Sequence, residues 1–142
     1  MVFTTMLRKM IYKPGASPKD GSLCVAETNS ESVPFEVKRV YYSYGVQEGV
    51  VRGHHAHKTL QQILICAYGK IEITLDDGKG SINTYILDDP SVGLYVGPST
   101  WRTMKWLISD SVLLVLASDH YEAADYIRDY DMFIESINQK ES

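Results

Sequence analysis

Three of the chain's four histidines lie within one heptapeptide, Arg52-Gly53-His54-His55-Ala56-His57-Lys58. If this segment is a strand, His55 and His57 project from the same face because side chains alternate, and His54 projects from the other. Two imidazoles on one interior face, with cationic neighbours, suit either metal binding or acid–base catalysis. We therefore take His55 and His57 as the candidate catalytic pair and His54 as an exposed or structural residue.

The spacing around the pair resembles the first cupin motif, in which a glycine precedes His-x-His and an acidic residue and a second glycine follow. Gly49 and Gly69 fall in register with that motif, but Gln62 stands where the acid is expected. The second cupin motif resembles the segment from Gly93 to Arg102, and Arg102 stands where a further histidine is usual.

These two departures bear on the metal question. A glutamine is a weak neutral donor, and an arginine is a permanent cation that repels a metal ion. Two imidazoles alone make a poor site for a divalent ion. The sequence thus predicts no metal and no other cofactor. A histidine near its unperturbed pKa of ~6.5 is a suitable general base at neutral pH, and Arg102 can stabilise negative charge on oxygen.

Short β-branched and aromatic runs, separated by Gly, Pro, Asp and Asn, predict an all-β fold of the sandwich or barrel type. In the cupin reading this is a small β-barrel or jelly-roll sandwich. The segment Tyr121–Ile137 has few helix breakers and predicts a short C-terminal helical segment of one or two turns. The expected strands are Leu23–Glu27, Phe35–Tyr44, Gln61–Tyr68, Lys70–Asp76, Ile82–Leu87, Gly93–Val96 and Ser111–Leu116, with an exposed hairpin turn at Asp76-Asp77-Gly78.

Composition limits the classes of partner. The chain has 142 residues, which predicts a single domain over 1–142, and 44% of them are apolar. A net charge of −4 gives no broad attraction to nucleic acid or to an anionic membrane. No apolar run approaches the ~20 residues that span a bilayer, and Met1 to Lys13 lacks a signal-peptide core. We expect a cytoplasmic protein in which Cys24 and Cys66 are separate buried thiols.

At this point the chain resembles a known group, the dTDP-sugar 3,4-ketoisomerases, a family of WxcM-like cupins. The matching segments are spread over roughly Gly21 to Phe133, and their combination is far more specific than the histidine pair alone. They are Lys38-Arg39-Val40-Tyr41-Tyr42, the histidine heptapeptide, Leu75-Asp76-Asp77-Gly78, Val92-Gly93-Leu94-Tyr95-Val96-Gly97-Pro98 with Trp101, Val115-Leu116-Ala117-Ser118-Asp119 and Asp125-Tyr126-Ile127-Arg128.

The resemblance implies a metal-independent reaction on dTDP-4-keto-6-deoxy-D-glucose that moves the keto group from C4 to C3 through an enediolate. It also implies a place in the biosynthesis of 3-amino-3,6-dideoxy sugars for lipopolysaccharide and other surface glycans. A homodimer with exchanged N-terminal strands is the assembly that it implies.

His55 and His57 match the family's catalytic histidines. Our hypothesis gives His57 the carbon-bound proton and His55 the proton on oxygen, and the reverse assignment stays open. One tyrosine of the Tyr41-Tyr42 pair matches an active-site tyrosine, and strand alternation lets only one of them face the cavity. We favour Tyr42.

The candidate substrate-binding residues comprise cations for the diphosphate and neighbours of the pair for the sugar: Arg52, Arg102, Lys58, Trp101 and Gln62. Arg128 is a further candidate cation, and Trp101 is proposed as a cavity wall. Arg102 falls at a position that is either His or Arg among relatives. The C4 configuration of the product, gluco or galacto, is therefore left open, as is the aromatic side chain that stacks on the base.

Three other functions fit parts of the pattern. A metal-dependent cupin dioxygenase would hold stoichiometric iron through the histidine pair. A nucleotide-sugar 3,5-epimerase-like cupin would exchange the proton at C5 with D₂O. A non-catalytic cupin would bind dTDP and leave the substrate unchanged.

Overall fold

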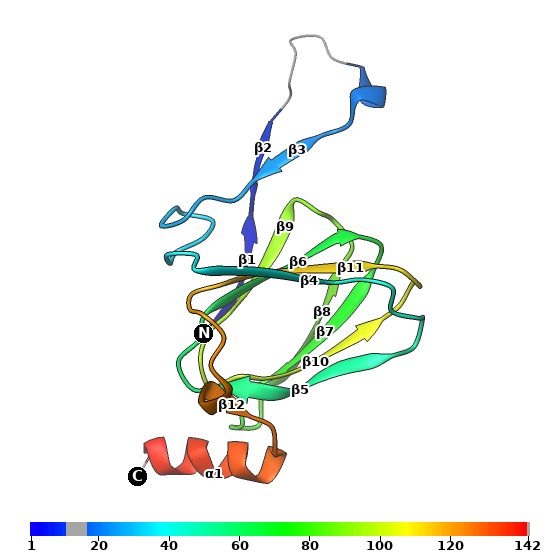
Figure 1. Ribbon diagram of the computed structural model, residues 1–142. Coiled ribbons are helices and arrows are strands. Elements are labelled where there is room, and N and C mark those ends of the chain that lie inside the picture. Colours follow the sequence, from blue (N-terminus) through cyan, green and yellow to red (C-terminus); the bar gives the residue numbers. More distant parts are fainter. Residues whose placement is uncertain (11–16, 142) are drawn as a thin grey trace.

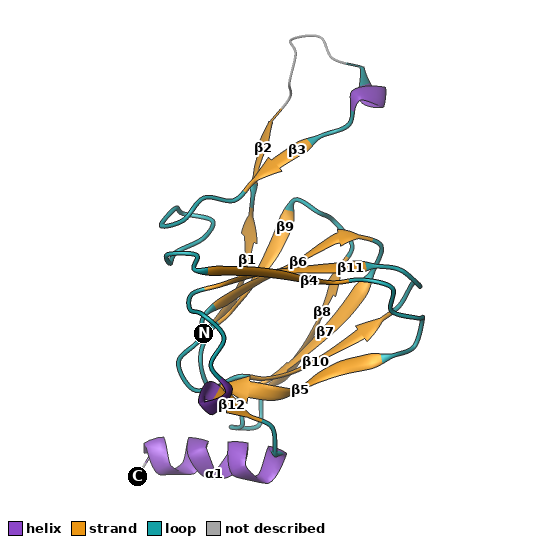
Figure 2. Cartoon of the chain, in the orientation of Figure 1, coloured by secondary structure: helices purple, strands orange, loops and turns teal. Residues whose placement is uncertain are grey.

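Two five-stranded antiparallel sheets face each other in a barrel-like sandwich (Figures 1 and 2). The computed structural model describes residues 1–10 and 17–141. The first sheet has the order β1 (Val2–Met6), β9 (Val92–Val96), β6 (Gln62–Tyr68), β11 (Val112–Ala117), β4 (Arg39–Ser43). The second has the order β12 (Tyr126–Ile127), β5 (Val51–His57), β10 (Trp101–Trp106), β7 (Ile71–Asp76), β8 (Ile82–Leu87).

The remaining elements lie outside the sandwich. Strands β2 (Arg8–Met10) and β3 (Leu23–Val25) pair with each other in an arm that extends away from the barrel in Figure 1. Two 3₁₀ turns, η1 (Pro18–Asp20) and η2 (Ala123–Asp125), precede β3 and β12. The helix α1 (Tyr130–Glu141) lies beside β5 and β12 at the opposite end of the molecule from the arm.

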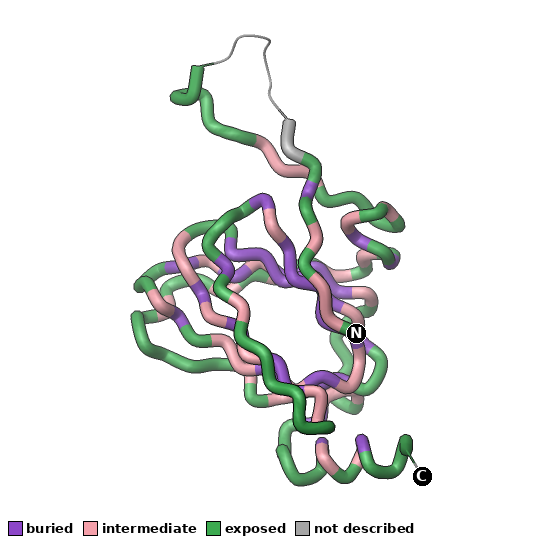
Figure 3. Tube along the Cα trace, turned by 180° about the vertical axis from the view of Figure 1, so that it is seen from behind, coloured by how far each residue is buried: buried purple, intermediate pink, exposed green. Residues whose placement is uncertain are grey.

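The main core fills the space between the two sheets, where Figure 3 shows the buried stretches of strand. Inward-facing side chains of β6, β7, β9 and β11 alternate with outward-facing ones, as the strand period requires. Trp106 is fully buried at one end of this core, and its indole N–H donates to the Ser111 carbonyl at 2.8 Å. This bond satisfies the one polar atom of the largest core side chain.

Two smaller clusters cover the outer faces of the sheets. Val33 and Phe35, from the segment before β4, pack over Ile63, Ile65 and Tyr95 on the outside of the first sheet. Phe133 and Ile137 of α1 pack against Ala56 of β5 and Ile127 of β12. The apolar face of the helix is thereby buried, and β5 is held in place from its outer side.

The expected all-β fold with a C-terminal helix is confirmed, and the strand Ile82–Leu87 has the predicted bounds. The predicted strand Phe35–Tyr44 is wrong over its first four residues, because Phe35 leaves the extended path to cover the first sheet. The segment Tyr121–Ile137 does contain helical turns, η2 and the first part of α1. The chain first pairs β12 with β5, so α1 begins only at Tyr130, and it continues to Glu141, further than predicted.

Several smaller expectations need correction. Strands β1, β2 and β10 were not predicted, because none of them alternates clearly between polar and apolar residues. Cys66 is buried as expected, but Cys24 is only half-buried. The hairpin turn at Asp76-Asp77-Gly78 is present, but Asp76 is buried, and it accepts hydrogen bonds from the Gly78 amide and the Tyr130 hydroxyl. No helix within the described residues is long and apolar enough to cross a membrane.

Gly69 occupies a backbone position that admits no side chain. Its φ is +94°, and a Cβ there would lie 2.0 Å from Oγ of Ser111, which itself accepts from the Lys70 amide. We expect Gly69→Ala to lower the free energy of unfolding by about 2–4 kcal/mol, measured by urea denaturation.

Gly80→Ala is the matched control, because Gly80 has a similar φ of +96° but open space around it. This variant should lower the free energy of unfolding only by the cost of a positive φ in a residue with a Cβ, about 1–2 kcal/mol. Equal losses in the two variants would show that the contact with Ser111 contributes nothing.

Candidate active site

A cavity of about 380 Å³ opens between the two sheets and contains one histidine of the predicted pair. Its size lies within the range of small-molecule sites, roughly 300–1,000 Å³. Polar side chains from β4, β5, β6, β10 and the β12 segment converge on an apolar floor. The lining residues are Arg39, Tyr41, Ser43, Arg52, Gly53, His55, Gln62, Leu64, Arg102, Met104, Trp106, Leu113, Val115, Tyr121, Tyr126 and Arg128.

A β-bulge sets the direction of His55. The pairing of β5 with β10 shifts register so that Arg102 opposes His55 while Thr103 opposes Gly53. His54 is the extra residue; it is exposed and has a φ of +54°. A side chain at Gly53, where φ is +96°, would lie 2.9 Å from the Arg102 carbonyl. The bulge therefore needs glycine, and it brings the His55 and Arg102 side chains to the same cavity.

His57 lies beside His55 and is hydrogen-bonded to Asp125. The two imidazole centroids are 4.9 Å apart and the rings are nearly perpendicular. Nδ1 of His57 lies 3.1 Å from a carboxylate oxygen of Asp125, whose other oxygen accepts from the amide and hydroxyl of Thr59 at 2.9 Å. This contact assigns the Nδ1 proton to the side facing Asp125, so Nε2 is the free basic nitrogen.

Both imidazoles are neutral at physiological pH. Burial, followed by the positive charge of Arg102, lowers the pKa of His55 to about 4. Burial, Arg102 and His55 also lower the pKa of His57, although Asp125 acts in the opposite direction. Partial burial raises the pKa of Asp125, but hydrogen bonds from Thr59 and the contact with His57 outweigh it and keep the carboxylate ionised. The site thus holds two imidazole bases and one carboxylate.

Arg102 is buried at the centre of a polar network. One terminal nitrogen donates to Oε1 of Gln62 and the other to the Thr100 carbonyl at 3.0 Å. The amide nitrogen of Gln62 donates to the Tyr41 hydroxyl at 2.8 Å. Burial lowers the pKa of Arg102 to about 10, so it stays charged at neutral pH. Burial raises the pKa of Tyr41, so its hydroxyl stays protonated.

Three more arginines line the same cavity and add to its positive potential. Arg39 lies over the ring of Tyr41 at 5.2 Å, and Arg128 lies over Tyr126 at 4.1 Å. Arg52 is exposed on β5. Such a cationic wall suits a diphosphate, which is bound through charge-assisted hydrogen bonds.

The prediction that Tyr42 faces the cavity is wrong. Tyr42 is 62% exposed on the outer face of β4, and Tyr41 lines the cavity instead. The reason is the register with β11: Tyr41 opposes Val115, which belongs to the inner core. Its neighbour must then point outward.

Two other predicted residues lie elsewhere. Trp101 is not a cavity wall, because Arg102 takes the inward position of β10 and Trp101 packs outside against Tyr130 and Phe133. Lys58 lines a neighbouring pocket on the far side of His57. Arg52, Arg102 and Gln62 do lie at the cavity with His55.

Asp125 and Arg39 are two charged residues of this region that sequence reasoning did not single out. Asp125 is 68 residues away from its histidine, and no local spacing connects them. Both belong to segments that match the ketoisomerase family, and that match was the available signal.

The chain offers a metal few ligands. Within the described parts of the chain, no group of three or more His, Cys, Asp or Glu side chains lies close enough to hold an ion. Where a metal cupin would add ligands to the histidine pair, this cavity holds Gln62 and the Arg102 cation.

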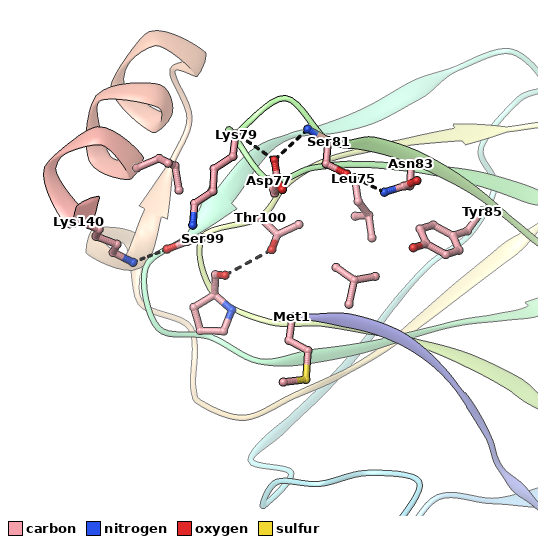
Figure 4. A pocket seen from close by; sticks show the side chains of 13 residues that line it. Met1, Leu75, Asp77, Lys79, Ser81, Asn83, Tyr85, Ser99, Thr100 and Lys140 are labelled. Atoms are coloured by element: carbon pink, nitrogen blue, oxygen red, sulfur yellow. Dashed lines mark hydrogen bonds between the residues drawn. The ribbon is translucent and has the colours of Figure 1, made fainter. Parts of the chain in front are cut away.

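A larger cavity of about 470 Å³ lies away from the histidines, between β1, the β7–β8 turn, the β9–β10 loop and α1 (Figure 4). Its two lysines already have partners: Lys79 pairs with Glu141 at 3.1 Å, and Lys140 bonds Ser99. Asp77 accepts from the amides of its own turn. This cavity has more volume but fewer groups suited to acid–base chemistry, so the histidine cavity is the better candidate.

Comparison with known proteins shows what the whole chain is similar to. The model of the FdtA family, described as WxcM-like, C-terminal, matches residues 6–138. A TDP-4-oxo-6-deoxy-alpha-D-glucose-3,4-oxoisomerase of Aneurinibacillus thermoaerophilus is 50% identical over 113 residues, which are 80% of each chain.

Solved structures give the same result. A mutant of the 3,4-ketoisomerase QdtA from Thermoanaerobacterium thermosaccharolyticum, in complex with TDP-4-keto-6-deoxyglucose, aligns over 98% of this chain and 95% of its own with 38% identity and a TM-score of 0.88. The WlaRB TDP-quinovose 3,4-ketoisomerase from Campylobacter jejuni is 44% identical, over 94% and 97% of the two chains, with a TM-score of 0.83.

The lowered pKa of His55 predicts loss of stability in mild acid. Unfolded histidine titrates near pH ~6.5, whereas folded His55 binds a proton only at about 4. As the pH falls through this window, the unfolded state binds protons that the folded state excludes, so stability decreases. The free energy of unfolding, measured in urea at pH 7.5 and 5.0, should fall less in His55→Asn than in the wild type.

His54→Asn is the matched control. His54 is exposed, and asparagine tolerates its positive φ, so this variant should keep the wild-type pH dependence. An unchanged acid response in His55→Asn would contradict the assignment of a neutral, desolvated His55.

Proposed function

The chain belongs to the FdtA family of WxcM-like proteins, and we propose on this basis that it is a sugar 3,4-ketoisomerase acting on dTDP-4-keto-6-deoxy-D-glucose. The relatives named above carry this activity in their names. The observation that carries the proposal is the neutral His55 beside the Arg102 network, in a cavity of suitable size with a cationic wall.

Isomerisation requires two proton movements. The proton on C3 must reach C4, and the proton on the C3 oxygen must reach the C4 oxygen, with an enediolate between the two states. The carbonyl at C4 acidifies the C3 proton, so a neutral imidazole near C3 and C4 can remove it and return it. The two movements together balance the atoms, and no electrons leave the sugar.

We assign the carbon-bound proton to His55. Of the two assignments that the sequence leaves open, this one is supported by position: His55 lines the cavity, whereas His57 is fully buried beside it. His57 then moves the proton between the oxygens. Asp125 fixes its tautomer and stabilises its charged form when it holds that proton.

The arginines account for the rest of the substrate. Arg102 lies deepest and stabilises negative charge that develops on the sugar oxygens. Arg39, Arg52 and Arg128 line the cavity and are the proposed ligands of the diphosphate. The reaction as written needs no metal, in line with the poor ligand set.

We further propose the homodimer with exchanged N-terminal strands that the resemblance implies. Three apolar side chains on or next to β4 are exposed, Val40 at 55%, Tyr42 at 62% and Tyr44 at 73%, which supports a covered surface there. Strand β1 lies at a sheet edge and, among the described residues, pairs only with β9, so the same strand of a second copy can replace it without changing the ladder. The surface-glycan pathway and the cytoplasmic location stay predictions.

His55→Asn tests the proposed base. We expect the variant to bind TDP like the wild type and to lose roughly 10²–10⁴-fold in kcat. The assay follows dTDP-4-keto-6-deoxyglucose by NMR, with a 3-aminotransferase added to trap the 3-keto product. It also reveals the C4 configuration.

His54→Asn is again the control and should retain wild-type kcat, while His57→Asn tests the second base. Wild-type kcat in His55→Asn, with full loss in His57→Asn, would contradict the assignment of the carbon-bound proton to His55 and favour His57 as the base. An inactive wild-type protein that still binds TDP would instead favour a non-catalytic cupin.

Strand exchange is tested by a disulfide across β1 and β9. Phe3 and Tyr95 oppose each other, with ring centroids 4.5 Å apart, so Phe3→Cys/Tyr95→Cys should oxidise readily. Light scattering should give twice the chain mass of 16.0 kDa. On a non-reducing denaturing gel, exchanged strands should give a covalent dimer that a reductant converts to monomer. Each single variant should run as a monomer on the same gel. An oxidised covalent monomer would contradict exchange.

A further inference from the structure

The orientation of the Gln62 amide is determined by the residue behind it. An arginine has only donors, so the atom of Gln62 that faces Arg102 must be the acceptor, Oε1. The NH₂ group of the same amide therefore faces Tyr41 and donates to its hydroxyl oxygen at 2.8 Å. Gln62 is 1% exposed, and a flipped amide would place its NH₂ against the guanidinium.

This orientation leaves the Tyr41 hydroxyl with one role. Its oxygen accepts from Gln62, so its own hydrogen must point elsewhere, and within the described residues no protein acceptor bonds it. Tyr41 lines the histidine cavity together with His55. Burial raises the pKa of Tyr41, so the hydrogen stays on the phenol.

The adjacent residue, Gln61, contacts a tyrosine with the opposite hydrogen-bond direction. Tyr95 donates its hydroxyl hydrogen to Oε1 of Gln61 at 2.8 Å, on the outer side of the first sheet. Two neighbouring glutamines thus contact two tyrosines, and only Gln62, fixed by Arg102, uses its NH₂ group to do so.

We propose that Gln62 is a positioning residue, locked by Arg102, that commits the Tyr41 hydroxyl to donate a hydrogen bond to the sugar oxygen that becomes negative in the enediolate. The inference rests on the proposed ketoisomerase function and adds the reason why the Tyr41 hydroxyl donates toward the sugar. Arg102 acts here through Gln62, since one of its terminal nitrogens is engaged by that amide. The Tyr41 hydroxyl is thereby preorganised, because its hydrogen points at the sugar oxygen before the negative charge of the enediolate develops.

Gln62→Glu tests this polarity with little change in volume. A carboxylate accepts from both neighbours, so Arg102 remains paired while the Tyr41 hydrogen turns away from the cavity. We expect kcat to fall on the order of 10²-fold, the cost of one oxyanion donor, with KM and the Kd for TDP within about threefold of wild type. Gln61→Glu makes the same charge change next door, where Tyr95 can still donate, and should keep wild-type kcat.

A double-mutant cycle separates this role from a structural one. Tyr41→Phe should lose as much kcat as Gln62→Glu, and Gln62→Glu should cost nothing further in the Tyr41→Phe background. Additive losses would overturn the proposal, as would wild-type kcat in either single variant.

Two outcomes remain distinguishable from these. If Gln62→Glu fails to fold, judged by thermal unfolding and TDP binding, Tyr41→Phe alone decides: unchanged kcat overturns the proposal, and a loss at constant TDP affinity supports it. If the wild-type protein shows no ketoisomerase activity, it is the proposed function that fails.

Discussion

A permanently charged guanidinium in the interior of a small barrel is the constraint on which the site depends. Removing such a group from water is costly, and the cost is recovered only through hydrogen bonds and nearby polarisable or negative groups. Arg102 obtains the Gln62 amide and the Thr100 carbonyl, and the Asp125 carboxylate adds a favourable charge interaction. Burial lowers the pKa of both histidines, and the Arg102 charge lowers it further. Burial and the cation together keep the bases neutral, and the cation also polarises the amide network beside them.

The sheets supply the geometry that this charge requires. Strand alternation alone would place side chains from β5 and β10 in a simple face-to-face pattern. The bulge at Gly53 and His54 breaks that pattern at one point, and His55 comes to lie opposite Arg102 as a result. The end of β5 at Ala56 and His57 is paired with β12 and covered by α1, so the part of the strand that carries the histidines is supported.

Much of this arrangement could be predicted from the sequence. The histidine pair, the replacement of metal ligands at Gln62 and Arg102, and the all-β fold all follow from local residue types and spacing. Tyr42 and Trp101 were misplaced because the inward parity of β4 and β10 is set by pairing with β11, β5 and β7, and short strands of mixed composition do not reveal it. Asp125 was missed because its contact with His57 is made only by the folded chain, across 68 residues.

The position of Asp125 has a consequence for how the protein matures. The strands of both sheets, except β12, precede Tyr121. A chain emerging from the ribosome can therefore begin to form its barrel before Asp125 is in place. Until β12 docks on the edge of β5, His57 has no partner to fix its tautomer. Assembly of the barrel and orientation of the His57 imidazole are thus separate events, and the second requires η2 and β12, which are translated after the other strands of both sheets.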